Sequence, residues 1–370
     1  MPEAERVLGP SPGVDKGPSI EQAFDVEAEQ ATSSVHTLGP DSSARSDGRS
    51  SKPQPPGPES RPYVAFETEW GMSIVGRSEI ALRSEIIEPF VGQVDLVLTS
   101  PPFPLNRKKE YGNFNGKEYV EWLAAFAPEL RRMLKPTGSL VLEIGNAWEP
   151  GRPVMSTFTF KALLAFLEAG DFSLCQQFIC HNPARLPSPV QWVNVERIRV
   201  KDSFTNVWWM STTDRPDADN RRVLQPYSAA MKSLLAGGHY NSGRRPSDHS
   251  IGESSFLTDN GGAIPPNVIV AANTHSADGY QRYCRDKGIP LHPARMPRSL
   301  VEFFVQFLTK PDGLVLDPFA GSNTTGAVAE AQGRRWIAIE ADPEYVRGSR
   351  GHFALRHRPN TVARRERLEA

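Results

Sequence analysis

Several features that define common protein classes are scarce or missing in this chain. Its 370 residues include only three cysteines, Cys175, Cys180 and Cys284, and their spacing matches neither a disulfide framework nor a zinc-ligand pattern. No apolar run is long enough to cross a membrane, and no apolar core follows the first charged residues. We therefore expect ordinary buried thiols, no metal site and a cytoplasmic protein.

The first sixty residues lack what a folded core requires. They are rich in Pro, Gly, Ser and acidic residues, with almost no aromatic residues and no sustained apolar period. Burial could not offset the entropy lost on ordering, so we predict a disordered tail over residues 1–60 and a folded domain over residues 61–370. The chain has 42 basic (Lys and Arg) and 43 acidic (Asp and Glu) residues, and the tail holds 5 of the basic and 10 of the acidic ones. The remainder is thus slightly basic, although far from the strongly basic balance of a simple DNA binder.

An apolar strand that ends in two prolines is the most informative stretch of the sequence. Residues 95–103 read DLVLTSPPF, in which Ser100, Pro101, Pro102 and Phe103 follow the apolar run. Prolines cannot donate hydrogen bonds, so the carbonyl groups around them remain as rigid acceptors. Ser100 adds a hydroxyl group, and Phe103 adds a flat face for a planar ring. This combination suits an exocyclic amino group on an aromatic ring.

A second motif, residues 313–342, has the pattern strand, loop, helix, strand. The loop begins DPFAG, where Gly321 permits close approach of a ligand to the backbone. Glu340 closes the second strand, the position from which a carboxylate accepts hydrogen bonds from ribose hydroxyl groups in nucleotide-binding folds. The loop has no GxGxxG pattern, which argues against a dinucleotide. The motif therefore predicts a nucleoside-bearing ligand of another kind.

The two motifs resemble those of the amino-directed DNA methyltransferases. The SPPF stretch is similar to their Ser/Asp/Asn-Pro-Pro-aromatic motif, in the TSPPF form typical of enzymes that act on N4 of cytosine. The DPFAG loop resembles their DPFxGSGTTG loop, which binds S-adenosylmethionine, with Asn at position 323 where many relatives have Gly. Asn tolerates a left-handed backbone well, so this difference is compatible with the same loop. The resemblance implies cofactor contacts from Asp317, Pro318, Phe319, Gly321, Ser322, Asn323, Thr324, Thr325 and Glu340.

A third element, HPARMP at residues 292–297, is similar to the HPxxKP element of the same family, which covers the methionine half of the cofactor. It implies further cofactor contacts from His292, Pro293, Arg295 and Pro297. The catalytic motif precedes the cofactor loop by about two hundred residues, as in the circularly permuted beta class of the family. The resemblance implies the α/β, Rossmann-like fold of S-adenosylmethionine-dependent methyltransferases. Alternating strands and helices independently indicate a mostly parallel sheet with helices on both faces.

Residues 182–288 are irregular, polar and rich in turn residues. We predict that they form an inserted target-recognition region within the domain, because arginine side chains suit phosphates and guanine edges. For any single arginine, a solvated surface charge is the more common explanation, so the prediction applies to the region as a whole. The predicted DNA contacts are Arg197, Arg199, Arg221, Arg222, Arg244 and Arg245.

Together, the motifs predict a site-specific DNA methyltransferase that modifies N4 of a cytosine swung out of duplex DNA. Transfer from S-adenosylmethionine would be direct, and the absence of a Pro-Cys dipeptide argues against cytosine-C5 enzymes. The competing interpretations are N6-adenine methylation, a non-catalytic DNA-binding relative, and methylation of RNA or a small molecule. The resemblance also implies a role in restriction–modification, in which a cognate endonuclease could act on the same site.

Overall fold

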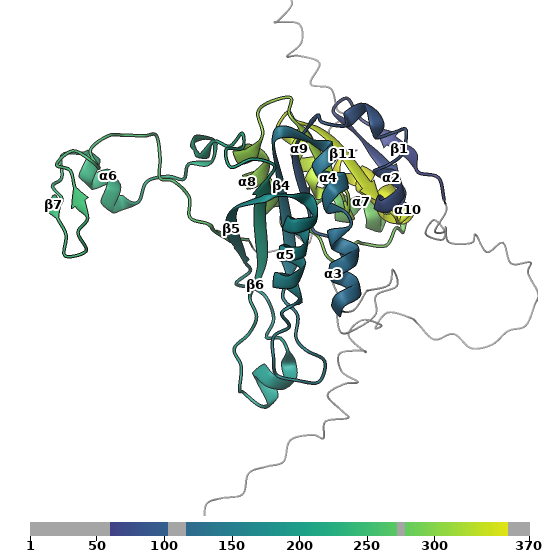
Figure 1. The fold of residues 1–370 in the computed structure, drawn as a ribbon, viewed down its shortest axis with the longest axis horizontal. Helices are drawn as coiled ribbons and strands as arrows, with labels where there is room; N and C mark the ends of the chain where they lie inside the picture. The colour runs from purple at the N-terminus through teal and green to yellow at the C-terminus, as the bar shows by residue number, and fades with distance from the viewer. Residues whose placement is uncertain (1–59, 103–115, 272–277, 354–370) are drawn as a thin grey trace, which may run out of the picture. The chain divides into compact units, whose positions relative to one another are not determined.

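The computed structural model describes residues 60–102, 116–271 and 278–353, so nearly all of the predicted tail, and Phe103, lie outside the described residues. Nine strands form one sheet in the order β1-β2-β11-β10-β3-β4-β6-β5-β9 (Figure 1). A separate hairpin pairs β7 with β8. The strands are β1 (Tyr63–Glu67), β2 (Gly71–Val75), β3 (Val94–Thr99), β4 (Leu134–Gly145), β5 (Ser173–His181), β6 (Phe204–Ser211), β7 (Gly243–Arg244), β8 (Ser250–Ile251), β9 (Val268–Val270), β10 (Leu314–Asp317) and β11 (Arg335–Glu340).

The directions of the strands create one edge at which most of them end. Strands β2, β11, β10, β3 and β4 are mutually parallel, which confirms the predicted mostly parallel sheet. Strand β6 is antiparallel to both β4 and β5, so β5 runs in the same direction as β4. We call the edge where these parallel strands end the carboxyl rim and the opposite edge the amino rim. Ligands of such sheets bind at the carboxyl rim.

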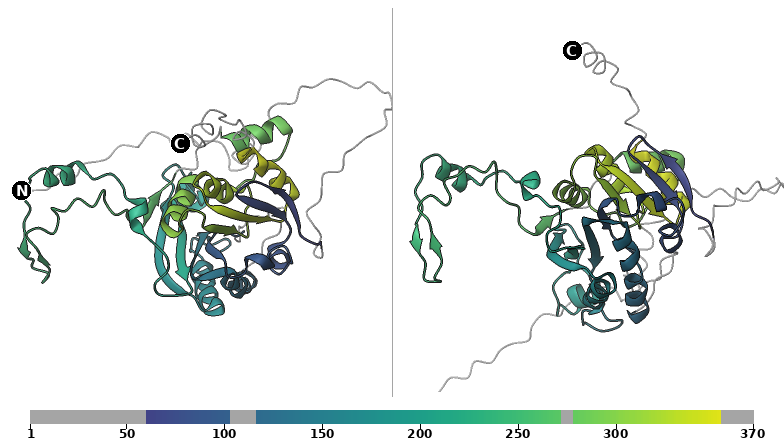
Figure 2. Two further views of the ribbon diagram at one scale, coloured as in Figure 1. Left: turned by 90° about the horizontal axis from the view of Figure 1, so that it is seen from above. Right: turned by 45° about the horizontal axis from the view of Figure 1, so that its top comes forward.

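Helices cover both faces of the sheet, as predicted, because strand side chains alternate between two hydrophobic cores. In β3, Val97 belongs to one core, whereas Leu96 and Leu98 belong to the other. In Figure 2 the blue and teal helices lie on one face and the yellow-green helices on the other. The helices are α2 (Ser78–Ala81), α3 (Gly116–Ala124), α4 (Ala127–Met133), α5 (Phe158–Gly170), α6 (Ala229–Leu235), α7 (Gly279–Lys287), α8 (Arg298–Leu308), α9 (Thr324–Ala331) and α10 (Pro343–Ser349), with short helical turns η1 (Glu88–Phe90), η2 (Gln191–Val195), η3 (Asn220–Val223) and η4 (Arg350–His352).

The stretch expected to be irregular, residues 182–288, is not irregular throughout. It contains β6, which lies inside the sheet and buries Trp208 and Trp209. The last six residues of β6, from Asn206 to Ser211, are all buried, so this strand has no alternating pattern that the sequence could reveal. Two protrusions remain, both visible in Figure 1. We call residues 146–157 and 182–203 the rim lobe, and residues 224–263, which include α6 and the β7–β8 hairpin, the arm.

Cys180 and Cys284 are buried and Cys175 is partly exposed, and all three thiols are free. No helix within residues 60–102, 116–271 and 278–353 is long and apolar enough to span a membrane.

Candidate active site

The two sequence motifs meet at the carboxyl rim. Strands β3 and β10 are neighbours in the sheet, and each ends in a buried polar residue, Thr99 and Asp317. The Thr99 hydroxyl group donates to Asp317 Oδ1 at 2.7 Å across a sequence separation of 218 residues. The SPP segment and the DPFAG loop therefore start from the same point on the rim.

Asp317 shapes the loop that follows it. Its Oδ2 accepts from the Thr325 hydroxyl group at 2.6 Å, and its Oδ1 accepts from the Phe319 backbone N–H at 3.1 Å. The side chain is only 2% exposed, and burial raises the pKa of Asp317 to about 6. With donors from both ends of the loop, this carboxyl group fixes the turn from β10 into α9.

Two residues of the loop adopt the left-handed backbone region, Gly321 at φ +52° and Asn323 at φ +57°. Asn therefore replaces Gly at position 323 without changing the turn, as its backbone tolerance predicts. Its Oδ1 also caps α9 by accepting from the Gly326 N–H at 2.9 Å. The buried Nδ2 of Asn323 has no hydrogen-bond partner among the described residues, so it remains as a donor for a ligand.

Glu340 ends β11 beside this loop. Its two carboxylate oxygens accept from the N–H groups of Gly321 and Asp342, each at 2.8 Å. Desolvation raises the pKa of Glu340 to about 7, and the nearby charges of Asp342 and Asp317 act in the same direction. The carboxylate is thus held at the position expected for a contact to ribose hydroxyl groups.

Other predicted cofactor residues cluster around the loop. A side chain at Gly321 would come within 2.8 Å of the His292 ring, which packs edge-on against Tyr345 at 4.7 Å between ring centroids. The Phe319 ring packs at 5.6 Å from Trp122 of α3, and Pro318 accepts a hydrogen bond from the Ser78 hydroxyl group. Ser322 and Thr324 share a hydrogen bond at 3.1 Å, and both residues are buried.

The remaining members of the HPARMP element have structural contacts. Arg295 forms a 2.5 Å ion pair with Asp278 and lies over the Tyr280 ring. Pro297 precedes α8 and accepts from the Leu300 N–H at 3.1 Å, whereas Pro293 is exposed. Of this element, His292 is the residue that directly approaches the glycine of the loop.

On the other side of β3, Ser100 contacts a residue that the sequence interpretation missed. Glu143 of β4 is only 7% exposed, and its carboxylate accepts from the Thr205 hydroxyl group of β6 at 2.8 Å. Burial raises the pKa of Glu143, and the nearby Ser100 side chain opposes part of that shift. A single glutamate within the apolar run LVLEIG, residues 140–145, was the available signal. Buried carboxyl groups of this kind are typical of functional sites.

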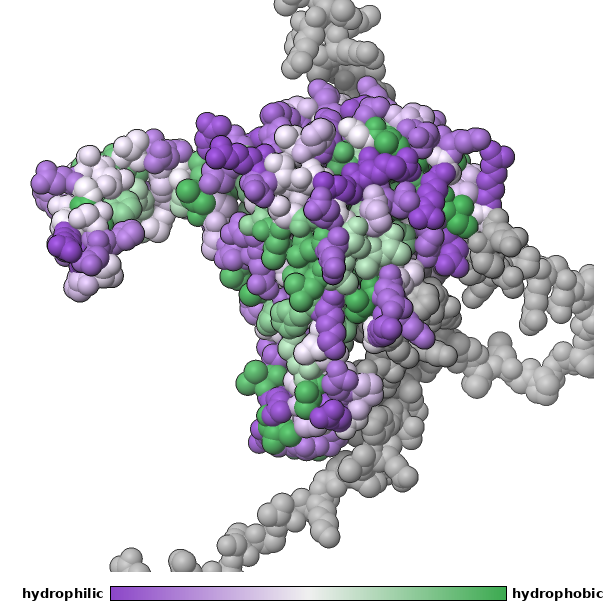
Figure 3. Space-filling model, in the orientation of Figure 1, coloured by the Kyte–Doolittle hydropathy of each residue, from purple (hydrophilic) through white to green (hydrophobic). Residues whose placement is uncertain are grey.

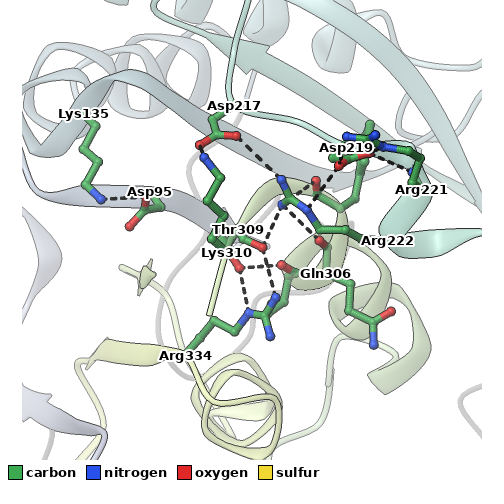
Figure 4. A network of polar contacts seen from close by, with 12 residues as sticks. Asp95, Lys135, Asp217, Asp219, Arg221, Arg222, Gln306, Thr309, Lys310 and Arg334 are labelled. Atoms are coloured by element: carbon green, nitrogen blue, oxygen red, sulfur yellow. Dashed lines mark hydrogen bonds and ion pairs between the residues drawn. The ribbon is translucent and has the colours of Figure 1, made fainter. Parts of the chain in front are cut away.

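The six predicted DNA-contacting arginines do not lie together. Arg222 is at the amino rim, where its guanidinium group and that of Arg334 both donate to the Thr309 carbonyl group, at 2.9 and 3.0 Å (Figure 4). Arg221, beside it, is exposed and pairs with Asp219 at 2.8 Å. Arg222 therefore holds the end of α8, on the edge of the sheet opposite Ser100.

The other four arginines lie in the two protrusions. Arg199 of the rim lobe donates twice to the Pro153 carbonyl group, at 3.1 and 2.7 Å, and so joins the two loops of the lobe. Arg197 is exposed. In the arm, Arg244 pairs with Asp248 at 2.6 Å and Arg245 donates to the Asn241 carbonyl group. Among the residues that the structure describes, no cluster of His, Cys, Asp or Glu could hold a metal ion.

Comparisons with known proteins agree with this geometry. A family model described as DNA methylase matches residues 94–350. The type II methyltransferase M.PvuII of Proteus hauseri is 46% identical over 292 residues, which cover 78% of this chain and 85% of that protein. A solved structure described as PvuII DNA methyltransferase (cytosine-N4-specific) has a TM-score of 0.63 and 39% identity, covering 78% of this chain and 88% of its own. The DNA adenine methyltransferase YhdJ of Escherichia coli strain K12 is 26% identical over 262 residues, which cover 69% of this chain and 74% of that protein.

The raised pKa of Glu340 predicts a pH effect on stability. Below pH 4.5 the carboxyl group is protonated in both states, but between pH 4.5 and about 7 only the folded protein keeps the proton. The folded state is therefore progressively destabilised as the pH rises through this window. Relative to the parent, Glu340→Gln should gain stability from pH 4.5 to about 7 and then level off. Thermal unfolding of the ligand-free proteins measures this difference, with the exposed Glu121→Gln as control; a flat difference would contradict the assigned shift.

Proposed function

The chain belongs to the N6/N4 DNA methylase family, and from this we propose that it transfers the methyl group of S-adenosylmethionine to N4 of cytosine in duplex DNA. The resemblance inferred from the two motifs is thereby confirmed. The observation that carries the proposal is the Thr99–Asp317 hydrogen bond, because it unites the cofactor loop with the amino-group site. Cytosine is favoured over adenine because the N4-specific relative is far more similar than the adenine-specific one.

The residues around the loop fit this cofactor. Glu340 would accept from the ribose hydroxyl groups, the unpartnered Nδ2 of Asn323 would donate to the ligand, and the missing side chain of Gly321 leaves room beside His292. Bound S-adenosylmethionine supplies an electrophilic methyl group on a positively charged sulfur. The hydrogen-bonding groups and the space around the loop are therefore compatible with S-adenosylmethionine, the methyl donor of the family.

Ser100 and Glu143 would handle the protons of the target amino group. A Ser100 hydroxyl group that donates to the nearby Glu143 carboxylate would keep its lone pairs to accept from the amino group, and the Pro101 carbonyl group offers a second acceptor. When nitrogen gains the methyl group and sulfur becomes a neutral thioether, the nitrogen must lose one proton. A buried carboxylate with a raised pKa is suited to take that proton through Ser100. No covalent intermediate with the protein is required.

The product of the reaction tests the assignment directly. DNA from cells that express the chain should contain N4-methylcytosine, detected by mass analysis after digestion, and sequencing of modified bases should locate it at one recognition site. An otherwise identical strain expressing Ser100→Ala serves as the control. If the DNA contained N6-methyladenine and no N4-methylcytosine, the target would be adenine and the same mechanism would apply to its amino group. DNA without either base would contradict the proposed activity.

The two halves of the site should separate in a variant series. Glu143→Gln should lower turnover by about 10²–10⁴-fold, the usual effect of losing a positioned base, with cofactor affinity nearly unchanged. Glu340→Ala should lower cofactor affinity by at least about tenfold, because up to two charge-assisted hydrogen bonds are lost. Calorimetry with S-adenosylmethionine and single-turnover rates give both quantities. Normal turnover of the Glu143→Gln variant would show that Glu143 does not act in the reaction.

The arm is our candidate for reading the DNA sequence. Backbone hydrogen bonds between Gln225 and Ala263, at 2.9 and 2.8 Å, close its base next to η3. Between those two residues, Gly262 is the one residue that the structure describes as buried, so the arm has no hydrophobic core. Aromatic contacts such as Tyr240 against Phe256, at 5.2 Å, are local and exposed. A segment of this kind gains most of its order from a partner, and its arginines suit phosphates and base edges.

Variants of the arm should change DNA binding without changing the transfer step. Replacing both Arg244 and Arg245 by Ala should weaken duplex binding and reduce the slope of log affinity against log salt concentration by about 1 for each phosphate that is no longer bound. The exposed Arg335→Ala, at the start of β11, is the matched control. Titrations at several salt concentrations measure the slope. An unchanged slope would exclude these two side chains from the DNA contact.

The relatives named as type II methyltransferases support two further parts of the proposal. A restriction endonuclease that cleaves the same site is the expected counterpart of this enzyme, and both would act on DNA in the cytoplasm. Cells that carry the chain should then survive an endonuclease directed at the methylated site.

A further inference from the structure

The rim lobe is built as one rigid unit on the catalytic side of the sheet. Residues 146–157 follow β4, and residues 182–203 connect the end of β5 to the start of β6, so both loops rise from the carboxyl rim. The Trp148 ring contacts the Trp192 ring at 5.4 Å between centroids, and Arg199 joins the loops through the Pro153 carbonyl group. The lobe therefore keeps its position relative to β4 and β6, which carry Glu143 and Thr205.

The surface of this lobe is unusually apolar. Leu186 is 81% exposed and Val200 is 86% exposed, the highest exposed fractions among the large apolar side chains that the structure describes. Figure 3 shows green side chains gathered on this lower protrusion. Single exposed aliphatic residues are common, but a group of them on a rigid projection indicates a contact surface. The other exposed apolar residues of the lobe are Val154, Met155, Val190, Val195 and Ile198.

Leu186 and Val200 lie on chain segments that are bonded to each other. The ammonium group of Lys201 donates to the carbonyl groups of Pro183 and Arg185, at 3.1 and 3.2 Å. The Asp202 N–H then donates to the Ser188 carbonyl group at 3.2 Å. Leu186 adjoins Arg185 and Val200 adjoins Lys201, so the two most exposed aliphatic residues lie on segments that are held side by side.

The base of the lobe continues into the catalytic residues. Asp202 accepts from the Asn146 amide group at 3.0 Å, and Asn146 in turn accepts from Asn206 of β6 at 2.8 Å. Thr205, the residue before Asn206, donates to Glu143. A nucleotide whose base reaches Ser100 would therefore bring its neighbours in the duplex close to this lobe.

Charge indicates the partner of this apolar surface. The same lobe carries the exposed cationic side chains Arg152, Arg197, Arg199 and Lys201. Exposed aliphatic side chains on a lobe that also carries exposed cations match a base step between two phosphate backbones, because apolar wedges enter between bases while cations bind phosphates. A hydrophobic protein surface would offer these cations no anionic group.

We propose that Leu186 and Val200 form a wedge that enters the base stack beside the target nucleotide and keeps open the space that the flipped base leaves. Arg197 and Lys201 bind the flanking phosphates. This inference rests on the proposed function and extends it, since it assigns positioning residues that act on the DNA and not on the methyl transfer itself. The wedge matters only while the target base must leave a paired stack, and a mispaired base leaves more easily.

The experiment compares two duplexes that carry the recognition site found by sequencing. In one the target cytosine is paired, and in the other it lies opposite an abasic position. Leu186→Ser combined with Val200→Ser should lower the single-turnover methylation rate at least about tenfold on the paired duplex and at most about twofold on the other. Leu164→Ser, a 65% exposed position on α5 outside the lobe, is the matched control and should be unaffected on both. Cofactor affinity and melting temperature should stay at the parent values, because both side chains are in solvent.

The pattern of rates separates the alternatives. Equal loss on both duplexes would overturn the wedge, since the two residues would then act on binding or chemistry in general. Unchanged rates on the paired duplex would overturn it as well. A parent protein that methylates neither duplex would instead overturn the proposed function, and the wedge with it. The proposal is supported if the double variant is slow on the paired duplex and regains nearly the parent rate on the duplex with the abasic position.

Discussion

The hydrogen bond from Thr99 to Asp317 is the constraint on which the rest of the site depends. It joins the ends of two neighbouring parallel strands, yet 218 residues separate its partners in the chain. Neither the cofactor loop nor the amino-group site can therefore be placed before β3 and β10 are paired. Parallel pairing of this kind forms late, because long loops must close first. Formation of the candidate site thus depends on the pairing of β3 with β10.

The two rims of the sheet carry different kinds of polar groups. At the carboxyl rim, burial raises the pKa of Glu143, Asp317 and Glu340, so that ionising them costs stability. At the amino rim, Arg222 and Arg334 donate to carbonyl groups at the end of α8, where the helix dipole favours positive charge. The candidate site therefore lies at the rim where ionisation of buried carboxyl groups opposes folding.

The motifs and the mostly parallel arrangement of the strands were predictable from the sequence, whereas the contacts between residues of distant strands were not. Ser100 and the DPFAG loop have local signatures, because prolines and glycines constrain the backbone wherever they occur. Glu143 has no such signature, since its role depends on β4 lying between β3 and β6. The same limit affected Arg222: a surface arginine and an arginine that caps a distant helix look alike in sequence. Trp208 and Trp209 similarly became core residues only through the pairing of β6 with β4 and β5.

The closed base of the arm has an evolutionary consequence. Because Gln225 and Ala263 are hydrogen-bonded to each other, the two ends of the segment stay adjacent whatever lies between them. The cost of a longer or shorter insert grows only slowly with its length, and hardly any intervening residue supports the sheet. This part of the chain can therefore diverge, or be exchanged between relatives as a cassette, while selection on the fold acts almost entirely elsewhere. If the arm reads DNA as proposed, new specificities can arise there without passing through unstable intermediates.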